Sequence, residues 1–245
     1  MIRDFYRKWS LKIEHIYFSN KLVRSDADVT RYHQSSYNFE GAEVFSSPII
    51  DLRKSDEEIF LSYRKSTRYE IRKLLNSDSN LKSTHIRSPD DNVIEKFIIF
   101  YNKFSEMKGL ISVPSADQGM LDRLRNNLII SSADYDGNSV AYHVYIFDES
   151  RVRLLYSATT TEKSAIKPSL LAMVNKFLHH QDIIWSKETG FTLYDFGGVA
   201  LEKKELDGIN KFKMGFTKNI EETNDFSTVN TLNGRVATLI EELLK

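Results

Sequence analysis

Apolar positions along the chain recur with two different periods, and the period changes several times. Over residues 1–50 the pattern is strand-like, because residues 11–18 alternate and residues 43–50 end in an apolar run. From residue 56 to residue 75 the period becomes helical, with apolar or small side chains at steps of three and four residues: Ile59, Tyr63, Thr67, Ile71 and Leu74. This spacing predicts one helix over residues 56–75 with a single buried stripe.

The next stretch predicts a strand and two helices. Residues 81–87 have the composition of a strand, and Ser88, Pro89 and Asp90 supply a cap, a first-turn proline and an acid near the positive end of a helix dipole. That helix runs to Gly109. A shorter helix follows Ser115, with three leucines inside: Leu121, Leu124 and Leu128.

Residues 128–156 form the clearest β region of the sequence. The turn residues Asp136, Gly137 and Asn138 join residues 129–135 to residues 140–147, and a second turn at residues 148–150 leads into residues 152–158. Short turns between consecutive strands predict an antiparallel meander.

A long helix follows the meander, beginning near Pro168 and ending near Gly190, with four apolar side chains directed inward: Leu171, Val174, Phe177 and Leu178. A buried strand at residues 191–196 comes next. We then expect a short helix near residues 205–211, a strand near residues 216–223 and a last helix over residues 233–244. A strand, a long helix and a strand in succession imply parallel pairing beside the antiparallel meander, so the sheet should be mixed. The fold class is α/β, and the element order is that of the GNAT N-acyltransferase fold.

Length and composition bound the domain organisation and the compartment. The chain has 245 residues with only 10 glycines and 4 prolines, so no flexible linker is evident. We expect a strand-rich extension, residues 1–50, packed on the core of a GNAT-like domain, residues 51–245. The N-terminus has charges scattered among its apolar residues, and no apolar run approaches the roughly 20 residues that cross a bilayer. These features predict a cytoplasmic protein without a transmembrane segment.

Charge and side-chain chemistry exclude several functions. The 34 basic residues balance 34 acidic ones, so no global field favours DNA or an anionic membrane, and a polyanion site must be a local patch. The absence of cysteine excludes disulfides, zinc–thiolate sites and a cysteine nucleophile. The six histidines show no metal spacing, so we expect no metal site. Trp9 and Trp185 are isolated and form no stacking platform for a single strand.

Three of the histidines lead to structural expectations. His143 lies in the middle of the predicted strand at residues 140–147, where a hydrogen-bonded sheet histidine is favoured over a general base. His179 and His180 follow Phe177 on the long helix and are expected at the surface.

Three arginines form a ridge on the predicted helix 56–75. Arg64, Arg68 and Arg72 stand at i, i+4 and i+8, each one position after a residue of the buried stripe, and Lys65 and Lys73 broaden the patch. Guanidiniums one turn apart repel each other, so helix stability does not account for them. They indicate a phosphate-binding site, the alternative being a solvated face balanced by the acids at residues 56–58.

A second group of residues surrounds the buried strand 191–196. Tyr194 and Asp195 come at the strand end before Gly197 and Gly198, where paired glycines allow close approach of a backbone or a ligand. Lys213 lies between Phe212 and Met214, as expected for a partly buried ammonium that stabilises negative charge. Taken singly, these features also fit a glycine turn, a loop cap and a snorkelling lysine.

Considered together, these segments resemble the FemABX peptidyltransferases, which are built on GNAT-like domains. Residues 63–73 resemble the segment that opens the family's second GNAT-like domain. Residues 155–158, 167–171 and 190–198 resemble its strand, long helix and strand core. The closing segment, residues 208–216, resembles the family's Phe-Lys pair followed by Gly-Phe. The resemblance spans residues 50–220.

The resemblance implies an acyl- or aminoacyltransferase that forms an amide on an amino group of a cell-envelope polysaccharide or peptidoglycan precursor. The donor would be aminoacyl-tRNA or an acyl-CoA, with no tightly bound cofactor, and the acceptor a phosphorylated glycan or a lipid-linked precursor. Arg68 and Arg72, together with Arg64, would hold phosphate, and Lys213 would stabilise the oxyanion. Asp195 would act with Lys213 at the catalytic centre, and Tyr194 and Tyr156 would line the acceptor site.

Two departures from the family keep other functions open. Residues 1–50 are too short for a complete first GNAT-like domain, and the helical-hairpin arm of some members is missing, which makes a smaller acceptor or an acyl-CoA donor conceivable. Acetyltransferases bind the CoA pyrophosphate with a glycine-rich loop before the long helix, whereas residues 159–168 contain no glycine, and Pro168 lacks a backbone donor. The alternatives are therefore an acetyl-CoA-dependent amino-sugar N-acetyltransferase and a GNAT-like module that binds a glycan phosphate without chemistry.

Overall fold

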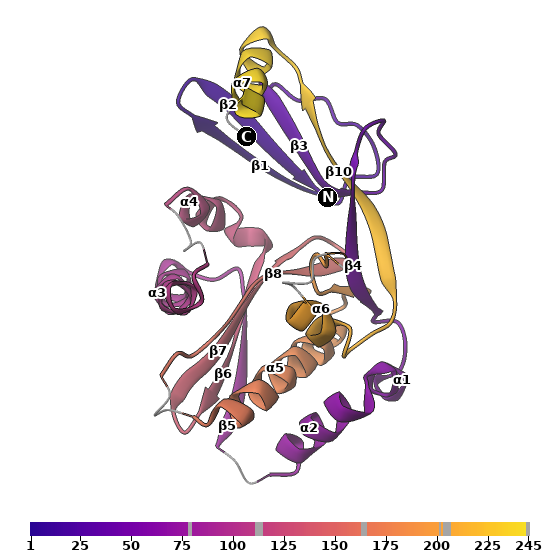
Figure 1. Ribbon diagram of the computed structural model, residues 1–245, viewed down its shortest axis with the longest axis vertical. Coiled ribbons are helices and arrows are strands. Elements are labelled where there is room, and N and C mark those ends of the chain that lie inside the picture. Colours follow the sequence, from indigo (N-terminus) through magenta and orange to yellow (C-terminus); the bar gives the residue numbers. More distant parts are fainter. Residues whose placement is uncertain (78–79, 111–114, 163–165, 201, 203–206, 244–245) are drawn as a thin grey trace. The chain divides into compact units, whose positions relative to one another are not determined.

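The computed structural model describes residues 1–77, 80–110, 115–162, 166–200, 202 and 207–243 (Figure 1). The chain forms two compact units, one made of Met1–Ser47 with Glu221–Lys245 and the other of Pro48–Ile220. The sequence pattern instead placed the whole stretch 51–245 in one domain. The C-terminal part joins the N-terminal residues because its strand pairs with a strand of the first unit, and such a long-range pairing leaves no mark in local periodicity.

The first unit is a small sheet with one helix. Its strands are β1 (Ile2–Lys8), β2 (Leu11–Tyr17), β3 (Val29–Ser35) and β10 (Ile220–Val229), in that order across the sheet, and its helix is α7 (Leu232–Leu243). β2 pairs antiparallel with β1 and parallel with β3, and β10 pairs antiparallel with β3. Ile16, Tyr32 and Phe226 form its buried core, with stacked rings of Tyr32 and Phe226.

The second unit is built on a mixed sheet, as the element order predicts. Strand β4 (Glu43–Asp51) leads into it from the first unit, and the order across the sheet is β4-β9-β8-β7-β6-β5. The other strands are β5 (Leu81–Arg87), β6 (Leu128–Tyr135), β7 (Asn138–Phe147), β8 (Arg151–Thr159) and β9 (Leu193–Asp195). The β6-β7-β8 meander is confirmed as antiparallel, and β8 and β9 are parallel.

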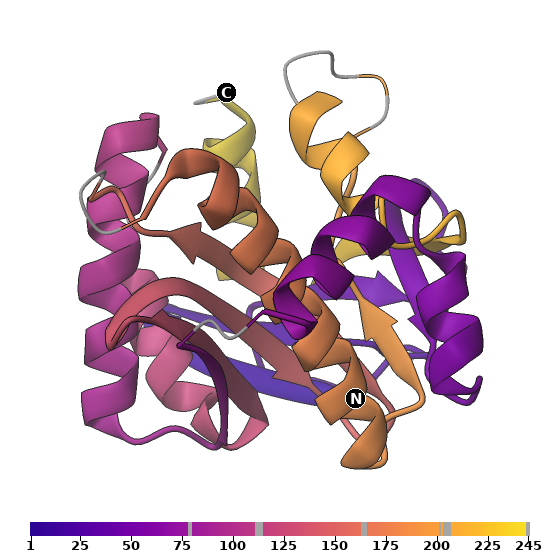
Figure 2. The same ribbon diagram turned by 90° about the horizontal axis from the view of Figure 1, so that it is seen from below.

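Helices cover both faces of this sheet (Figures 1 and 2). They are α1 (Asp56–Ser62), α2 (Lys65–Leu75), α3 (Asp91–Lys108), α4 (Ser115–Arg123), α5 (Pro168–Glu188) and α6 (Asp207–Lys213). Neighbouring residues of a strand point to opposite faces. On β7, Tyr142 packs against Phe100 of α3, whereas His143 is hydrogen-bonded to Asp182 of α5. Helix α3 therefore covers one face and α5 the other, with α2 packed on the outside of α5.

The predicted glycine ends of α3 and α5 are confirmed, but α3 begins two residues later than the cap at Ser88 predicts. Asp90 is the cap, accepting a hydrogen bond from the Val93 N–H at 2.9 Å, so Ser88 and Pro89 precede the helix, and Gly109 ends it at φ 62°. Gly190, at φ 95°, follows the last turn of α5. Both glycines adopt the left-handed conformation that terminates helices and that other residues adopt only with strain. Within the described residues, no helix has the length and apolarity needed to cross a membrane.

The prediction of one continuous helix over residues 56–75 is wrong, because the chain breaks at Tyr63 and Arg64. Tyr63 has ψ 150° and ends α1, while Arg64 precedes the first residue of α2. The break has a tertiary cause. The Arg64 N–H donates to the Gly215 carbonyl at 2.8 Å, and the Tyr63 ring is buried against Phe216. The buried stripe itself is confirmed, since all five of its residues are buried.

Candidate active site

Strands β8 and β9 separate after a short stretch of parallel pairing. Arg151–Arg153 pair with Leu193–Asp195, after which β9 ends while β8 continues to Thr159. One residue further along β8, the register against β7 shifts between Leu154 and Tyr156, so that Leu155 is the extra residue of a bulge. A bulge redirects side chains, and separated strands open the sheet. This point of the second unit is therefore suited to hold a site.

The chain leaves β9 through a turn that only glycine fits. Gly197 has φ 70°, and a Cβ atom at this position would lie 2.8 Å from the Leu154 carbonyl oxygen. The buried Asp195 carboxylate holds the turn by accepting hydrogen bonds from the Gly197 N–H at 2.7 Å and from Arg151 Nη1 at 3.1 Å. The predicted glycine turn is thus present. Asp195 contacts the turn and Arg151, which gives it a positioning role in this structure.

Lys213, in the last turn of α6, reaches this turn. Its Nζ donates to the Gly198 carbonyl at 2.7 Å. Burial lowers the pKa of the Lys213 ammonium to about 8; Asp195 works against this shift and Arg153 adds to it. The ammonium has three N–H donors, and one bond to Gly198 leaves two for a ligand.

A cavity of about 300 Å³ lies beside Lys213, and we call it the Lys213 cavity. Helices α3, α5 and α6, strand β8 and Leu110 contribute its walls. Its apolar lining includes Tyr101, Phe104, Leu154 and Phe212, and its polar lining includes Ser157, Asn175, His179 and Lys213. A mostly apolar cavity with a few convergent polar groups is the usual form of a small-molecule site.

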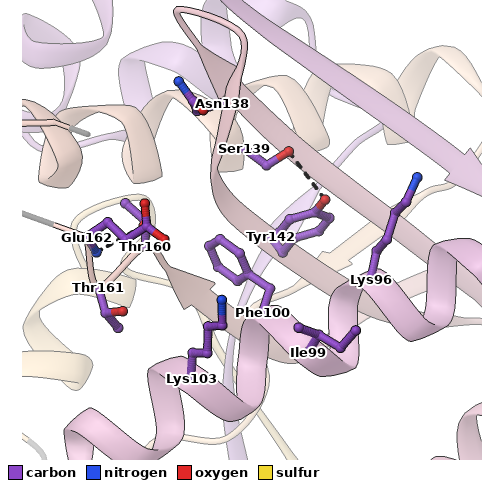
Figure 3. A pocket seen from close by; sticks show the side chains of 10 residues that line it. All are labelled: Lys96, Ile99, Phe100, Lys103, Asn138, Ser139, Tyr142, Thr160, Thr161 and Glu162. Atoms are coloured by element: carbon purple, nitrogen blue, oxygen red, sulfur yellow. Dashed lines mark hydrogen bonds between the residues drawn. The ribbon is translucent and has the colours of Figure 1, made fainter. Parts of the chain in front are cut away.

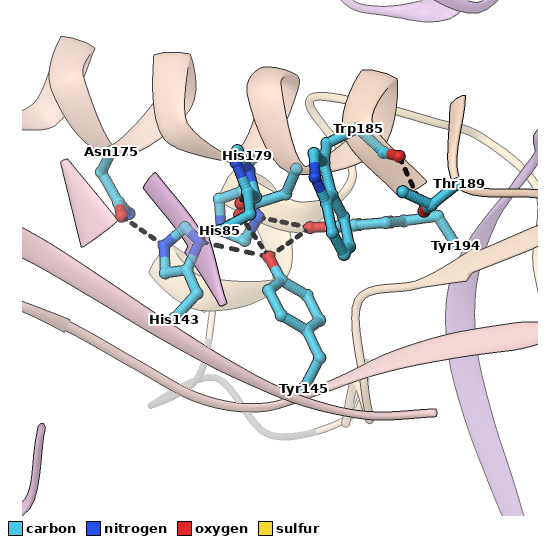
Figure 4. A network of polar contacts seen from close by, with 9 residues as sticks. His85, His143, Tyr145, Asn175, His179, Trp185, Thr189 and Tyr194 are labelled. Atoms are coloured by element: carbon cyan, nitrogen blue, oxygen red, sulfur yellow. Dashed lines mark hydrogen bonds and ion pairs between the residues drawn. The ribbon is translucent and has the colours of Figure 1, made fainter. Parts of the chain in front are cut away.

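A buried hydrogen-bond network leads from this cavity into the core (Figure 4). His179 Nδ1 lies 2.9 Å from the Tyr194 hydroxyl, which lies 2.7 Å from the Tyr145 hydroxyl, and Tyr145 donates to Asp182 Oδ2 at 2.5 Å. The Asp182 carboxylate is also bonded to two imidazoles, His143 at 2.7 Å and His85 at 2.9 Å. Burial alone would raise the pKa of Asp182, but these hydrogen bonds outweigh it and hold the pKa well below its usual range.

The network determines which nitrogen of His179 carries the proton. Burial and the Asp182 charge raise the pKa values of Tyr145 and Tyr194 well above the ordinary value, so both hydroxyls keep their proton. Since Tyr145 gives its one proton to Asp182, it accepts from Tyr194, and Tyr194 in turn accepts from the Nδ1–H of His179. His179 then has an unprotonated Nε2, which makes no hydrogen bond with the described residues.

Electrostatics also favour the neutral form of His179. Burial lowers its pKa well below the ordinary value, and the nearby His143 and Lys213 act in the same direction, while Asp182 opposes them. A neutral imidazole with a free Nε2 is the form that accepts a proton. The Lys213 cavity therefore has among its lining residues both a hydrogen-bond donor, Lys213, and a candidate base, His179.

The three arginines lie elsewhere in the second unit, and none of them lines the Lys213 cavity. Arg68 Nη1 donates to the Leu61 carbonyl at 2.7 Å, which gives a hydrogen-bond partner to a carbonyl in the last turn of α1. The Arg72 guanidinium lies 5.0 Å from the centre of the Phe60 ring. Arg64 is exposed. The chain break separates Arg64 from the helix that carries the other two, so the ridge is not a single helical face.

The two predicted tyrosines are placed differently. Tyr194 is fully buried and belongs to the hydrogen-bond network, where its hydroxyl joins His179 to Tyr145. Tyr156 is half-buried on β8, with its ring centroid 5.1 Å from that of Tyr101 on α3, a residue of the cavity wall. Neither tyrosine is itself a wall residue of the Lys213 cavity.

The sequence pattern missed His179, and the prediction that His179 and His180 lie at the surface is wrong. Both are buried, because α5 lies between the sheet and α2 and so has two buried faces. A polar stripe on α5 was the available signal: Asn175, His179, Asp182 and Ser186 follow each other at four, three and four residues. The expectation that His143 is a hydrogen-bonded sheet histidine is confirmed, with partners Asp182 and Asn175.

His143, His179 and Asp182 have their ligand atoms within 4.8 Å of one another, a geometry that a metal ion could share. The direct hydrogen bond between His143 and Asp182 already satisfies both groups. We therefore interpret the cluster as part of the hydrogen-bond network.

A second cavity of about 310 Å³ lies at the end of β8 (Figure 3). Lys96, Phe100 and Lys103 of α3 line one side, and Thr160, Thr161 and Glu162 line another. These last residues begin the glycine-free stretch 159–168, of which residues 163–165 lie outside the described part of the chain. The cavity offers the side-chain ammonium groups of Lys96 and Lys103 and the hydroxyl groups of Thr160 and Thr161.

Comparison with known proteins identifies the fold. No protein-family model matches the sequence, and no curated protein matches it. Among solved structures, FemX has a TM-score of 0.67 and 14% identity, covering 97% of this chain and 85% of its own. The C-terminal domain of a putative lysylphosphatidylglycerol synthetase from Agrobacterium fabrum has a TM-score of 0.58 and 10% identity, with 99% and 85% covered. L-PGS from Bacillus licheniformis has a TM-score of 0.57 and 12% identity, with 97% and 84% covered. The chain therefore has the FemABX-like, GNAT-type fold that the sequence motifs indicate.

Replacing Gly197 by Ala tests the turn that presents Gly198 to Lys213. The new Cβ would lie 2.8 Å from the Leu154 carbonyl oxygen, at a φ that L-residues adopt only with strain, so we expect unfolding free energy to fall by about 2 kcal/mol or more. Gly190→Ala is the matched control, because its φ is also positive but nothing lies within 4 Å. Denaturant unfolding measures both, and equal losses would show that the close approach to Leu154 is unimportant.

Proposed function

We propose that this protein is an acyl- or aminoacyltransferase that forms an amide on an amino group of a cell-envelope polysaccharide or peptidoglycan precursor. The observation that carries the proposal is the meeting of Lys213 and His179 at one cavity. Amide formation needs a donor for the oxyanion and an acceptor for the amine proton, and these two side chains supply both. The FemABX-like resemblance of residues 50–220 points to the same chemistry.

The reaction follows from the chemistry of the groups. The amine nitrogen attacks the donor carbonyl carbon, and the Lys213 ammonium stabilises the oxyanion with the N–H groups that Gly198 leaves free. Nε2 of His179 accepts a proton from the attacking nitrogen. The carbon–oxygen bond of an ester donor, or the carbon–sulfur bond of a thioester, then breaks, and the leaving group takes the proton that His179 removed from the amine, which returns His179 to its neutral form. No enzyme-bound acyl intermediate is needed, which agrees with a sequence that has no cysteine.

The positive charge that forms on His179 has a partner in the core. As Nε2 takes a proton, the imidazolium keeps its Nδ1–H bond to Tyr194, and the hydroxyls of Tyr194 and Tyr145 lead on to the Asp182 carboxylate. The charge of Asp182 favours the protonated form of His179 and so opposes the depression of its pKa by burial. This coupling supports His179 as the base.

Substrate phosphates have two candidate positions in the second unit. Arg64, Arg68 and Arg72 offer guanidiniums for a phosphorylated glycan or a lipid-linked acceptor, as the resemblance implies. The second cavity offers Lys96 and Lys103 to a donor that carries phosphate, whether aminoacyl-tRNA or acyl-CoA. One structure of this fold is described as a putative lysylphosphatidylglycerol synthetase, a name that refers to the aminoacylation of a lipid and supports an aminoacyl donor and a cell-envelope acceptor.

An acetyl-CoA-dependent amino-sugar N-acetyltransferase is the second candidate, because Lys96 and Lys103 line a cavity together with residues 160–162, the start of the stretch before the long helix. A donor screen by thermal unfolding separates the two. A ligand that binds only the native state at a hundred times its Kd adds about 2.7 kcal/mol, or roughly 5–10 °C for a chain of this size. We expect aminoacyl-tRNA to stabilise the protein more than CoA or acetyl-CoA.

The outcomes of this screen are distinct. Stabilisation by acetyl-CoA alone would favour the N-acetyltransferase. Stabilisation by a phosphorylated glycan alone, without turnover of any donor, would contradict transferase activity and favour a binding module.

A further inference from the structure

The hairpin that joins β1 to β2 carries an aromatic side chain that packs against nothing. Trp9 is 95% exposed at the tip of this hairpin, and Phe5 on β1 is 47% exposed. Trp9 also has φ 57°, a backbone region that bulky residues rarely occupy. An exposed indole in a strained turn adds nothing to the stability of the first unit, so binding is the better explanation of its placement.

Basic side chains surround Trp9. Arg7 pairs with Lys12 across the hairpin and Lys8 pairs with Leu11, and the side chains of Arg7 and Lys8 are exposed. Asp28 lies close to these cations, since its carboxylate accepts hydrogen bonds from the Lys12 N–H at 2.8 Å and from the Thr231 hydroxyl at 2.5 Å. These bonds lower the pKa of Asp28 and keep it ionised. Three cations against one carboxylate leave a local positive charge on a chain of zero net charge.

We propose that this hairpin tip, residues 7–12, binds the surface of an anionic lipid bilayer. Trp prefers the boundary between headgroups and acyl chains, where its ring is buried and its N–H stays near polar groups. Arg and Lys beside it attract anionic headgroups while their aliphatic stems lie along the apolar boundary. The inference does not depend on the proposed chemistry, since it rests on residues of the first unit alone.

Two other occupants fit the tip less well. Single-stranded RNA needs bases stacked on successive aromatic rings, but Phe5 and Trp9 are four residues apart, about 13 Å along a strand. A second copy of the chain docked tip to tip would bring Arg7, Lys8 and Lys12 against the same cations, which is unfavourable. An anionic lipid surface satisfies both the indole and the cations.

The test is vesicle binding by the full chain. We expect flotation with vesicles of phosphatidylcholine and phosphatidylglycerol but not with phosphatidylcholine alone, and weaker binding in high salt. Trp9→Ala should weaken binding about tenfold or more, and Lys8→Gln about fivefold. The indole supplies a second readout, because Trp9 emission should move to shorter wavelength on binding, and Trp9→Ala should remove this shift.

The control is Val44→Ser, which removes an exposed apolar side chain of the same unit that is 65% exposed and has no basic neighbour in sequence. It should bind vesicles as the wild type does, and Trp9→Ala should unfold at the wild-type temperature. Equal binding to neutral vesicles, an absence of vesicle binding, or normal binding by Trp9→Ala would each overturn the proposal. Loss of tRNA binding in Trp9→Ala, with no vesicle binding by the wild type, would assign the tip to RNA instead.

Discussion

Lys213→Met should strongly lower kcat and at the same time make the protein more stable. Methionine fills a similar volume but provides neither charge nor N–H donors, so the oxyanion loses its stabilisation. Loss of one such donor lowers kcat by about 10²–10³. The ammonium is held in a site that disfavours its charge, and methionine removes this penalty. We expect the unfolding free energy at pH 7 to rise by roughly 1–2 kcal/mol, after allowance for the lost bond to Gly198.

The change of folding stability with pH tests whether the Lys213 charge is disfavoured. Folding lowers the pKa of Lys213 from 10.5 to about 8, so between these values the unfolded chain holds a proton that the folded chain has lost. Stability from this group therefore rises as pH increases from 8 to 10.5, and the penalty is complete below pH 8. The wild type should show this rise and Lys213→Met should not. Turnover should fall above about pH 8, because the oxyanion site needs the ammonium.

Lys211→Met is the matched control for the measurements of turnover and of stability against pH. Lys211 lies on the same helix, is 73% exposed and pairs with Asp207 at 3.5 Å, outside the walls of the cavity. It should leave kcat and the pH profile unchanged. Unchanged kcat in Lys213→Met would show that Lys213 has no part in the mechanism. A less stable Lys213→Met variant would contradict the claim that burial disfavours the charge of Lys213.

Local patterns predicted most of the second unit because its elements are encoded by neighbouring residues. The meander depends on short turns between alternating strands, and α3 and α5 end at glycines whose conformation the sequence reveals. Contacts from distant residues overrode this local information. The helix 56–75 breaks because Gly215 takes the Arg64 N–H, and the final strand joins the first unit because it pairs with β3. Periodicity carries no signal for either event.

The candidate site likewise has some residues that local patterns reveal and others that depend on long-range contacts. Lys213 and the Gly197–Gly198 turn were predicted because a lysine among apolar residues and paired glycines are local anomalies. His179 was missed because a histidine on a helix is ordinary until the helix is known to be buried on two sides. Its tautomer depends on Tyr145, Tyr194 and Asp182, which come from three different elements. Only the assembled fold brings these groups together.

His179→Asn and His179→Gln separate the two nitrogens of the proposed base. An Asn amide retains a donor near the Nδ1 position, which keeps the bond to Tyr194, whereas a Gln amide extends toward the Nε2 position; neither accepts a proton at neutral pH. We expect both to lower kcat by about 10²–10⁴ with little change in KM. His179→Asn should be the more stable of the two, because it keeps the network to Asp182 intact.

Chemical rescue distinguishes a base from a residue that only fills space. Replacing His179 by Asn enlarges the cavity of about 300 Å³, so added imidazole should enter and restore part of the turnover, with a pH dependence that follows the added base. His180→Asn is the control: His180 is also buried and lies 3.3 Å from the Tyr63 hydroxyl, but it is not a wall residue of the cavity. His180→Asn should reduce the stability of the protein without changing the pH dependence of turnover. Full turnover by His179→Asn, or a loss that imidazole never restores while the variant remains folded, would leave His179 as a structural member of the buried network.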